Sequence, residues 1–361
     1  GTTWFDRTNY FETVPKNALD KVLWLESDRM GHFADAISQE KLDEQRGVVQ
    51  NEKRQGDNQP YGRVWETILR NVFPARHPYS WETIGSMEDL NAATLEDVRE
   101  WFQTYYGPNN AVIVIAGDID TATAVAKVRT YFGDIPPGPP LTKPGRWIPD
   151  HAEDRRASMQ DRVPQPRLYK VWAGPEWGSA DAVYLSLAST ILGGDKNSRL
   201  YQRLVYRDQI ATDVAVAPMA FEISGITYLV TSAQPGHTLS ELEIVAGEEL
   251  ARFIEDGPTR KELDRARAGV RAAFLRGIES VGGQAGKSGI LASNMVYGGS
   301  PDLYKRELQI IADATRDDIR RAAERWLNRG AFVLEVTPYP ELAPAQAVAD
   351  RSAPPQPGPA P

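Results

Sequence analysis

Residues 263–273 read LDRARAGVRAA, and residues 42–52, which lie 221 positions earlier, read LDEQRGVVQNE. The later stretch carries apolar residues at the spacing that lines one buried face of a helix: Leu263, Ala266, Val270 and Ala273. The equivalent places in the earlier stretch are occupied by Leu42, Gln45, Val49 and Glu52, of which Gln45 and Glu52 are polar. A carboxylate at the place of a core alanine is costly unless a polar partner awaits it. Glu52 is therefore the leading candidate for a functional residue.

The same offset relates a second pair of segments. Thr94 and the acidic residues after it align without gaps on Thr315 and its acidic successors, and each set is typical of a capped helix start. Both helices then run into an apolar stretch that predicts a strand, at residues 111–115 in the first copy and 332–336 in the second. The repeat predicts an internal duplication.

Helical patterns alternate with strand-like runs such as 226–231, which predicts an α+β fold. We expect two homologous domains, each a mostly antiparallel sheet with helices packed on one face. Prolines gather between residues 136 and 166, so the predicted domains are 1–150, truncated at its start, and 160–338, without metal ligands. Residues 339–361 are rich in Pro and Ala and predict a linker or tail.

Composition excludes several classes of function. A formal net charge of −8 argues against a protein that binds the phosphate backbone of nucleic acids. No apolar run approaches the roughly 20 residues that cross a bilayer, so no membrane segment is expected. The chain has no cysteine, so a zinc site would have to use His, Asp or Glu. None of the four histidines has a second histidine four residues later, and we assign none of them as a ligand: His32, His77, His151 and His237.

Several longer motifs occur together along the chain. They are TTWFDRTNYFETVP at 2–15, QRGVVQNEKRQGDNQPYG at 45–62, HPYSWETIGSMEDL at 77–90, YYGPNNAVIVIAGDID at 105–120 and GGDKNSRLYQRLV at 193–205. In combination they resemble the insulinase and pitrilysin family of zinc peptidases, the inverzincins. The resemblance covers nearly the whole chain up to Pro338.

The resemblance implies a zinc-dependent endopeptidase. The family uses an HxxEH helix, whose two histidines bind zinc and whose glutamate is the general base, and a glutamate from a later helix as third ligand. Glu52 matches that third ligand, so one zinc ion would be held by Glu52 and two histidines. The HxxEH motif is absent from this sequence, and the family spacing places it roughly two dozen residues before Gly1. No catalytic residue is therefore assigned, and the fragment as given is expected to be inactive.

The sequence departs from the family pattern at two sets of positions, beside the zinc ligand and at the substrate-gripping pair. Many members carry a second glutamate seven residues before the ligand, whereas this chain has Gln45 there, with Glu44 beside it, and either could support the ligand by hydrogen bonding. The substrate-gripping arginine and tyrosine of the family are replaced by Val205 and Thr212. The chain thus resembles the catalytic half of a two-half chamber, in which a second homologous half, covalently linked or separate, supplies the Arg/Tyr pair.

The resemblance also implies a substrate and a compartment. The family strand that matches Thr2, Thr3 and Trp4 offers its edge to a peptide or unfolded polypeptide, which joins through main-chain hydrogen bonds. A bacterial periplasmic or secreted location is implied as well. The alternative hypothesis is a noncatalytic scaffold or partner subunit with the same fold.

Overall fold

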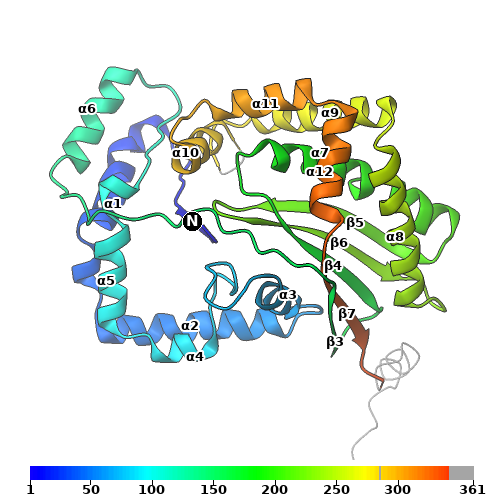
Figure 1. Ribbon diagram of the computed structural model, residues 1–361. Helices are drawn as coiled ribbons and strands as arrows, with labels where there is room; N and C mark the ends of the chain where they lie inside the picture. The colour runs from blue at the N-terminus through cyan, green and yellow to red at the C-terminus, as the bar shows by residue number, and fades with distance from the viewer. Residues whose placement is uncertain (284–285, 341–361) are drawn as a thin grey trace, which may run out of the picture.

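In the computed structural model, the described residues are 1–283 and 286–340 (Figure 1). The second half of the chain is built on a five-stranded sheet in the order β3-β7-β4-β6-β5. Its strands are β3 (Arg155–Asp161), β4 (Arg167–Gly174), β5 (Ala211–Ala220), β6 (Gly225–Ala233) and β7 (Phe332–Pro338). β3 pairs parallel with β7 and the other pairings are antiparallel, which confirms the α+β prediction and the mostly antiparallel sheet expected here.

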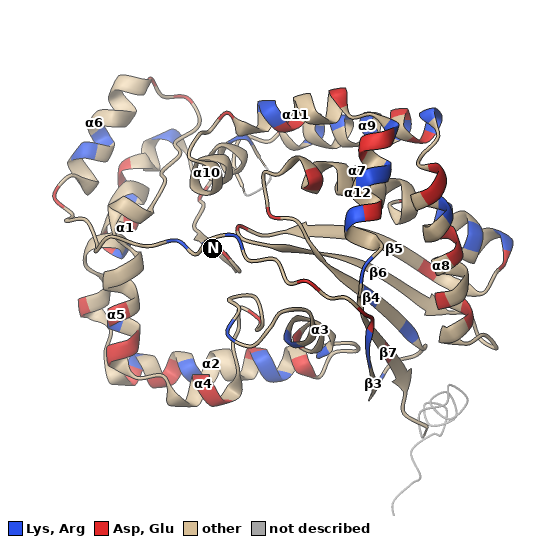
Figure 2. Cartoon of the chain, in the orientation of Figure 1, with Lys and Arg blue, Asp and Glu red and all other residues tan. Residues whose placement is uncertain are grey.

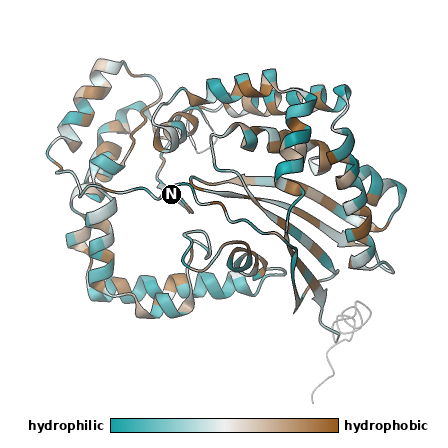
Figure 3. Ribbon diagram, viewed as in Figure 1, coloured by the Kyte–Doolittle hydropathy of each residue, from teal (hydrophilic) through white to brown (hydrophobic). Residues whose placement is uncertain are grey.

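The helices of the second half gather on one face of this sheet (Figure 1). They are α7 (Ala180–Gly193), α8 (Leu239–Asp256), α9 (Arg260–Gly277), α10 (Lys287–Gly298), α11 (Leu303–Asp313) and α12 (Arg316–Leu327), with a π-helix at Tyr201–Arg207. Alternate strand residues such as Leu168, Trp172 and Val333 point into this helix layer and are buried with it. Figure 3 shows the corresponding apolar bands along the strands.

The opposite face of the sheet is covered by a helix from the first half, α3 (Val64–Val72). Ile68 and Val72 of α3 are buried in one cluster with Tyr169, Val171 and Leu334, which alternate along β4 and β7 with the residues of the other face. The five-stranded sheet therefore has helices on both faces, whereas the sequence predicted one. The segment that supplies the second layer lies inside the predicted domain 1–150.

The remaining helices of the first half form an arm around the N-terminal hairpin (Figure 1). They are α1 (Leu19–Gly31), α2 (Gln39–Asp57), α4 (Met87–Ala92), α5 (Leu95–Tyr105) and α6 (Thr121–Phe132). Acidic and basic residues both occur along α2 and α5, as they do along α9, α11 and α12 (Figure 2). Among the described helices, none combines the length and the apolar character needed to cross a membrane.

The first half departs from the prediction of its own sheet. Its strands within residues 1–150 are β1 (Thr2–Trp4) and β2 (Arg7–Asn9), which pair only with each other. The strand expected at residues 111–115 is not formed, and Val112 and Ile113 are 36% and 43% exposed. A strand needs a hydrogen-bonded neighbour, and none of the described strands lies beside this segment. The predicted tail at 339–361 lies outside the described residues from position 341 onward.

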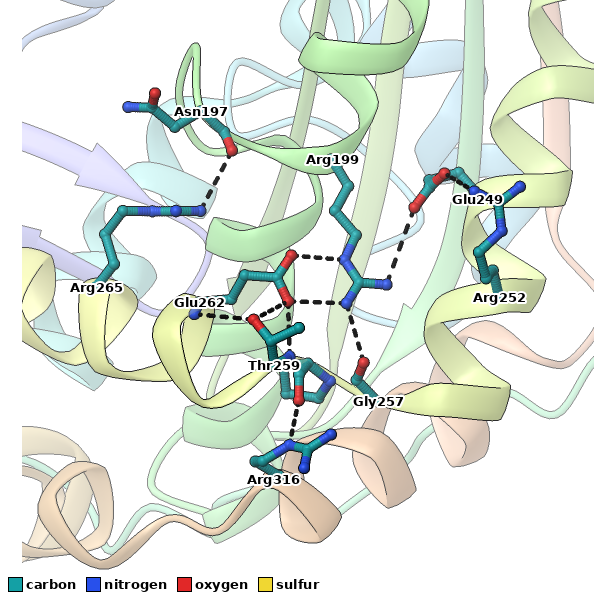
Figure 4. A network of polar contacts seen from close by, with 10 residues as sticks. Asn197, Arg199, Glu249, Arg252, Gly257, Thr259, Glu262, Arg265 and Arg316 are labelled. Carbon is teal, nitrogen blue, oxygen red and sulfur yellow. Dashed lines mark hydrogen bonds and ion pairs between the residues drawn. The ribbon is translucent and has the colours of Figure 1, made fainter.

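A buried ion-pair network joins the helices of the second half (Figure 4). Arg199 donates from Nε and Nη2 to the two carboxylate oxygens of Glu262, both at 2.8 Å, and lies 3.9 Å from Glu249. Glu262 also accepts hydrogen bonds from the amide and hydroxyl of Thr259, which form the capping box at the start of α9. The network fixes the ends of α8 and α9 to the segment that follows α7.

Candidate functional site

The N-terminal hairpin brings three predicted substrate-binding residues into one strand. Thr2, Thr3 and Trp4 form β1, and all three are exposed. In the register of β1 on β2, Thr3 pairs with Thr8, and their hydroxyls lie 3.1 Å apart. Because this sheet has two strands, one edge of β1 has main-chain groups that face no other strand within residues 1–283 and 286–340. That edge has the geometry required for an added strand, and its role in substrate binding stays a prediction.

The turn of the hairpin is held by aromatic packing. Phe5 lies edge-on to Tyr79, with ring centroids 5.6 Å apart, and at 4.7 Å from the ring of Phe221 in the turn between β5 and β6. Burial raises the pKa of Asp6, the next residue of the turn, although hydrogen bonds from Tyr79 and from the Glu222 amide partly offset this. Burial likewise raises the pKa of Tyr297 to about 12. The turn therefore lies in a desolvated contact with the second half.

The predicted ligand and its supporting residues lie together on α2. Gln45 and Glu52 are seven residues apart and lie on the same face of α2 as Val48. This face is turned away from the contacts that α2 makes with α4. Glu52, Gln45 and Glu44 are all exposed. Figure 1 shows α2 and the hairpin as separate elements of the first half.

The expectation of a buried carboxylate is wrong for this structure. Glu52 is exposed, and so is Ala273, the residue of α9 that the sequence argument took as part of the core. On α9 the buried stripe consists of Leu263 and Ala266, with Val270 half-buried, and it ends before Ala273. Both aligned stretches are helical, in α2 and α9, but the apolar spacing overstated how far the neighbouring elements cover α9.

A zinc ion does not fit the described residues as a complete site. No group of three His, Cys, Asp or Glu side chains that could hold a metal occurs within residues 1–283 and 286–340. One exposed carboxylate leaves most of the coordination shell of zinc to water, whereas protein zinc sites supply three or four ligands. Glu52 can therefore act as a ligand only if other side chains are brought to it.

His77 has a structural role. Its Nδ1 accepts from the Tyr79 amide at 3.1 Å, so Nε2 carries the proton and donates to the Trp147 carbonyl at 2.9 Å. The imidazole stacks on Phe73 with centroids 4.5 Å apart, and burial lowers its pKa. It is a neutral packing group that joins the loop after α3 to the segment before β3.

The sequence analysis missed a buried lysine beside the candidate ligand. Lys53 has a side chain only 6% exposed, with Asp57 at 3.2 Å and Glu66 of α3 at 3.8 Å. Nearby, burial raises the pKa of Glu82. The spacing of Lys53 and Asp57, four residues apart on one helix, was the available signal. This cluster fixes α2 to α3, and so orients the exposed stripe that carries Glu52.

The positions that align with the substrate-gripping pair have other roles. Val205 is half-buried against the core of the second half. The Thr212 hydroxyl donates to Gln165 Oε1 at 3.2 Å. Neither side chain offers a charged or phenolic group to a substrate.

Comparisons with known proteins agree with this architecture. Residues 92–270 match the model of the peptidase M16 inactive domain. The chain is 25% identical over 327 residues to the zinc protease PqqE of Helicobacter pylori, covering 90% of this chain and 72% of that protein. It is 27% identical over 348 residues to an uncharacterized zinc protease of Mycobacterium leprae, covering 91% and 73%.

A solved structure shares the fold. The crystal structure of a protease from Helicobacter pylori superposes with a TM-score of 0.81 at 22% identity, covering 90% of this chain and 78% of that one. The matched family model and the zinc-protease relatives confirm the resemblance found in the sequence motifs. Over residues 92–270 the chain is therefore similar to the peptidase M16 inactive domain, and over most of its length it is similar to proteins named as zinc proteases.

Proposed function

We propose that this chain is the part of an M16 zinc endopeptidase that supplies one zinc ligand and the strand that binds the substrate. In this proposal Glu52 is one zinc ligand, two histidines come from a further segment that covers α2, and β1 receives the peptide. The observation that carries the proposal is a mismatch in burial between equivalent positions of the two halves. Because the chain alone supplies one carboxylate, we assign it no catalytic step of its own.

The equivalence of the two halves is supported by a repeated contact. Arg46 of α2 donates to the Leu90 carbonyl at 2.9 Å and the Ala93 carbonyl at 2.5 Å. Arg267 of α9, 221 residues later, donates to the carbonyls of Ile311 and Ala314, which stand at the same offset from Leu90 and Ala93. In each half, an arginine at the matching position thus binds the C-terminal end of the next aligned helix, α4 for Arg46 and α11 for Arg267. This repeated contact supports an internal duplication.

Residues that are exposed in the first half correspond to buried residues in the second. Trp101 and Tyr105 of α5 are 57% and 42% exposed, whereas their equivalents Ala322 and Trp326 of α12 are 2% and 5% exposed. Val112 and Ile113 are 36% and 43% exposed, and their equivalents Val333 and Leu334 are fully buried in β7. Exposing several large aromatic and branched side chains to water in one part of a protein is unfavourable. We infer that another segment covers this face of the first half.

The second half indicates what that segment contains. β7 lies between β3 and β4, and α7 lies against both α9 and α12. By the same arrangement, residues 111–115 would gain a strand on each side, and a helix would lie against α2 and α5. A helix in the place of α7 is the element that would bring two histidines to the stripe of Glu52. Its source is a neighbouring part of the same polypeptide or a separate chain.

The substrate we propose is a peptide or unfolded segment that adds to the free edge of β1. Recognition by main-chain hydrogen bonds predicts broad side-chain specificity. Because Val205 and Thr212 replace the gripping pair, we propose that a second homologous half carries that pair and closes a chamber over the substrate. A periplasmic or secreted location fits this proposal.

Zinc content tests the assignment of Glu52. We expect the protein in its full natural assembly to hold one zinc ion and to cleave an unfolded polypeptide. Glu52→Gln should lose most of the zinc and the activity, because one of three ligands is removed. Glu40→Gln, in the first turn of the same helix, is the matched control and should change neither. Residues 1–361 alone should bind no stoichiometric zinc, and zinc-dependent cleavage by them would refute the need for outside histidines.

A noncatalytic role is the second candidate. It is favoured by the match to a family model described as an inactive domain and by the absence of a metal-binding cluster in the described residues. In that case the assembled protein would hold no zinc at Glu52, and Glu52→Gln would leave both the metal content and any activity of the assembly unchanged.

A further inference from the structure

We propose that Tyr79 is a positioning residue, which holds the β1–β2 hairpin on the turn between β5 and β6 and thereby fixes the strand that receives the peptide. This inference rests on the proposed function for its consequence, but the positioning itself is testable without it. The turn, here called the seat, consists of residues 221–224 in the second half.

Three hydrogen bonds connect the hairpin to the seat, and two of them involve the hydroxyl of Tyr79. The Tyr79 hydroxyl donates a hydrogen bond to Oδ1 of Asp6. The tyrosine oxygen also accepts a hydrogen bond from the Ile223 amide at 3.2 Å. The other carboxylate oxygen of Asp6 accepts from the Glu222 amide at 3.0 Å. A tyrosine hydroxyl has one proton and two lone pairs, so it can make both contacts at once. The phenol therefore joins two segments that are far apart in the sequence.

The tyrosine ring is fixed on all sides. Tyr79 is 2% exposed, and its ring centroid lies 4.8 Å from that of Phe221 and 5.6 Å from those of Phe5 and Phe73. Its amide bonds to His77, as described above. Such packing leaves the hydroxyl little freedom, and Phe73, His77 and Phe221 hold the ring from outside the hairpin.

The seat is also rigid. The Phe221 amide donates to the Ser224 carbonyl at 2.8 Å, which closes the turn. A side chain at Gly225 would lie 2.5 Å from the Pro175 carbonyl, so the chain after the turn is closely packed. Outside the turn, Lys143 pairs with Glu222 at 2.6 Å. The hairpin thus docks on a surface that the five-stranded sheet holds in place.

The hairpin needs this support because it is small. Two strands of three residues do not form a stable sheet on their own in water. The orientation of β1 must therefore come from contacts at its turn, and Phe5 and Asp6 supply them. A peptide that adds to β1 depends on that orientation, since the main-chain groups of both strands must be in register. The second half thus orients β1, the strand that receives the peptide, without contacting the peptide itself.

Hydrogen exchange in the intact chain tests the positioning. Tyr79→Phe keeps the ring and removes the hydroxyl, so the amides of residues 2–9 should exchange about tenfold faster, while those of β4 keep their wild-type rates. Tyr61→Phe is the matched control. It removes a hydrogen bond of 2.8 Å to the Gln165 carbonyl, which also joins the two halves but lies away from the hairpin, and it should leave residues 2–9 unchanged.

Binding of a labelled unfolded polypeptide, followed by fluorescence anisotropy, tests the consequence. We expect Tyr79→Phe to weaken binding about tenfold and Tyr61→Phe to leave it unchanged. Unchanged exchange of residues 2–9 in Tyr79→Phe would overturn the inference, and so would faster exchange with unaltered peptide binding. If the wild-type protein binds no peptide while the exchange result is as expected, the proposed function fails and the positioning role of Tyr79 stands.

Discussion

The substitution Glu262→Gln should remove the charge that holds Arg199 at the junction of α8 and α9 (Figure 4). Glutamine can still accept from the Thr259 amide, because a capping box tolerates Gln in place of Glu. It cannot neutralise the guanidinium of Arg199, whose side chain is only 15% exposed. The substitution therefore tests the ion pair more than the helix cap.

The magnitude follows from the pKa of Glu262. Burial alone would raise this pKa, but the hydrogen bonds from Arg199 and Thr259 lower it from 4.5 to about 2. A pKa that is lower in the folded protein stabilises it above pH 4.5, and this contribution is lost as the pH falls through about 2. The difference corresponds to about 3 kcal/mol at pH 7, so the variant should lose about 2–3 kcal/mol of unfolding free energy.

Urea unfolding at two pH values checks the prediction. The wild type and Glu262→Gln should differ by about 2–3 kcal/mol at pH 7 and by less than about 1 kcal/mol at pH 2.5. The control is Glu241→Gln, which alters the corresponding capping box of α8, where the carboxylate is exposed and its ion-pair partner is His237 instead of a buried arginine. It should unfold nearly as the wild type does. Equal stability of wild type and Glu262→Gln at pH 7, or a difference that does not change with pH, would refute the reasoning.

Three further results are expected. Glu52→Gln in the isolated chain should change the unfolding free energy by less than about 0.5 kcal/mol, because the side chain is exposed; a larger loss in urea would mean that the carboxylate has a structural partner. Acidification below about pH 6.5 should weaken the packing around His77, because burial lowers its pKa in the folded state; an NMR titration that shows an ordinary histidine pKa would contradict this. Arg267→Lys should lower the unfolding free energy by about 1–2 kcal/mol, because lysine cannot bind the carbonyls of Ile311 and Ala314 as a fork; a thermal midpoint equal to that of the wild type would argue against the contact.

Local signals in the sequence were read correctly. The starts of α5 and α12 are the capping boxes of Thr94 and Thr315, as their acidic first turns predict. These contacts lie within four residues of one another, so the sequence contains nearly everything that determines them. The strands at 226–231 and 332–336 were also predicted, and both lie in the interior of the sheet as β6 and β7.

Signals that depend on distant partners were read less well. Residues 111–115 have the composition of β7, but composition does not supply the neighbouring strands. Glu52 and Ala273 share the helix spacing of a buried stripe, yet their burial depends on whether another element reaches that end of the helix. The packing of α3 on the second sheet and the role of Tyr79 were not predicted, because both join residues that are at least 73 positions apart.

The place of β7 has a consequence for how this protein is made. β7 is the last of the described strands along the chain, yet it lies between the two strands that open the second half, β3 and β4. During synthesis, β3 and β4 emerge well before the strand that joins them, so their inner edges stay unpaired until residues 332–338 leave the ribosome. A nascent chain released before that point would expose both edges to other nascent chains, and any chaperone that protects it must act before translation ends.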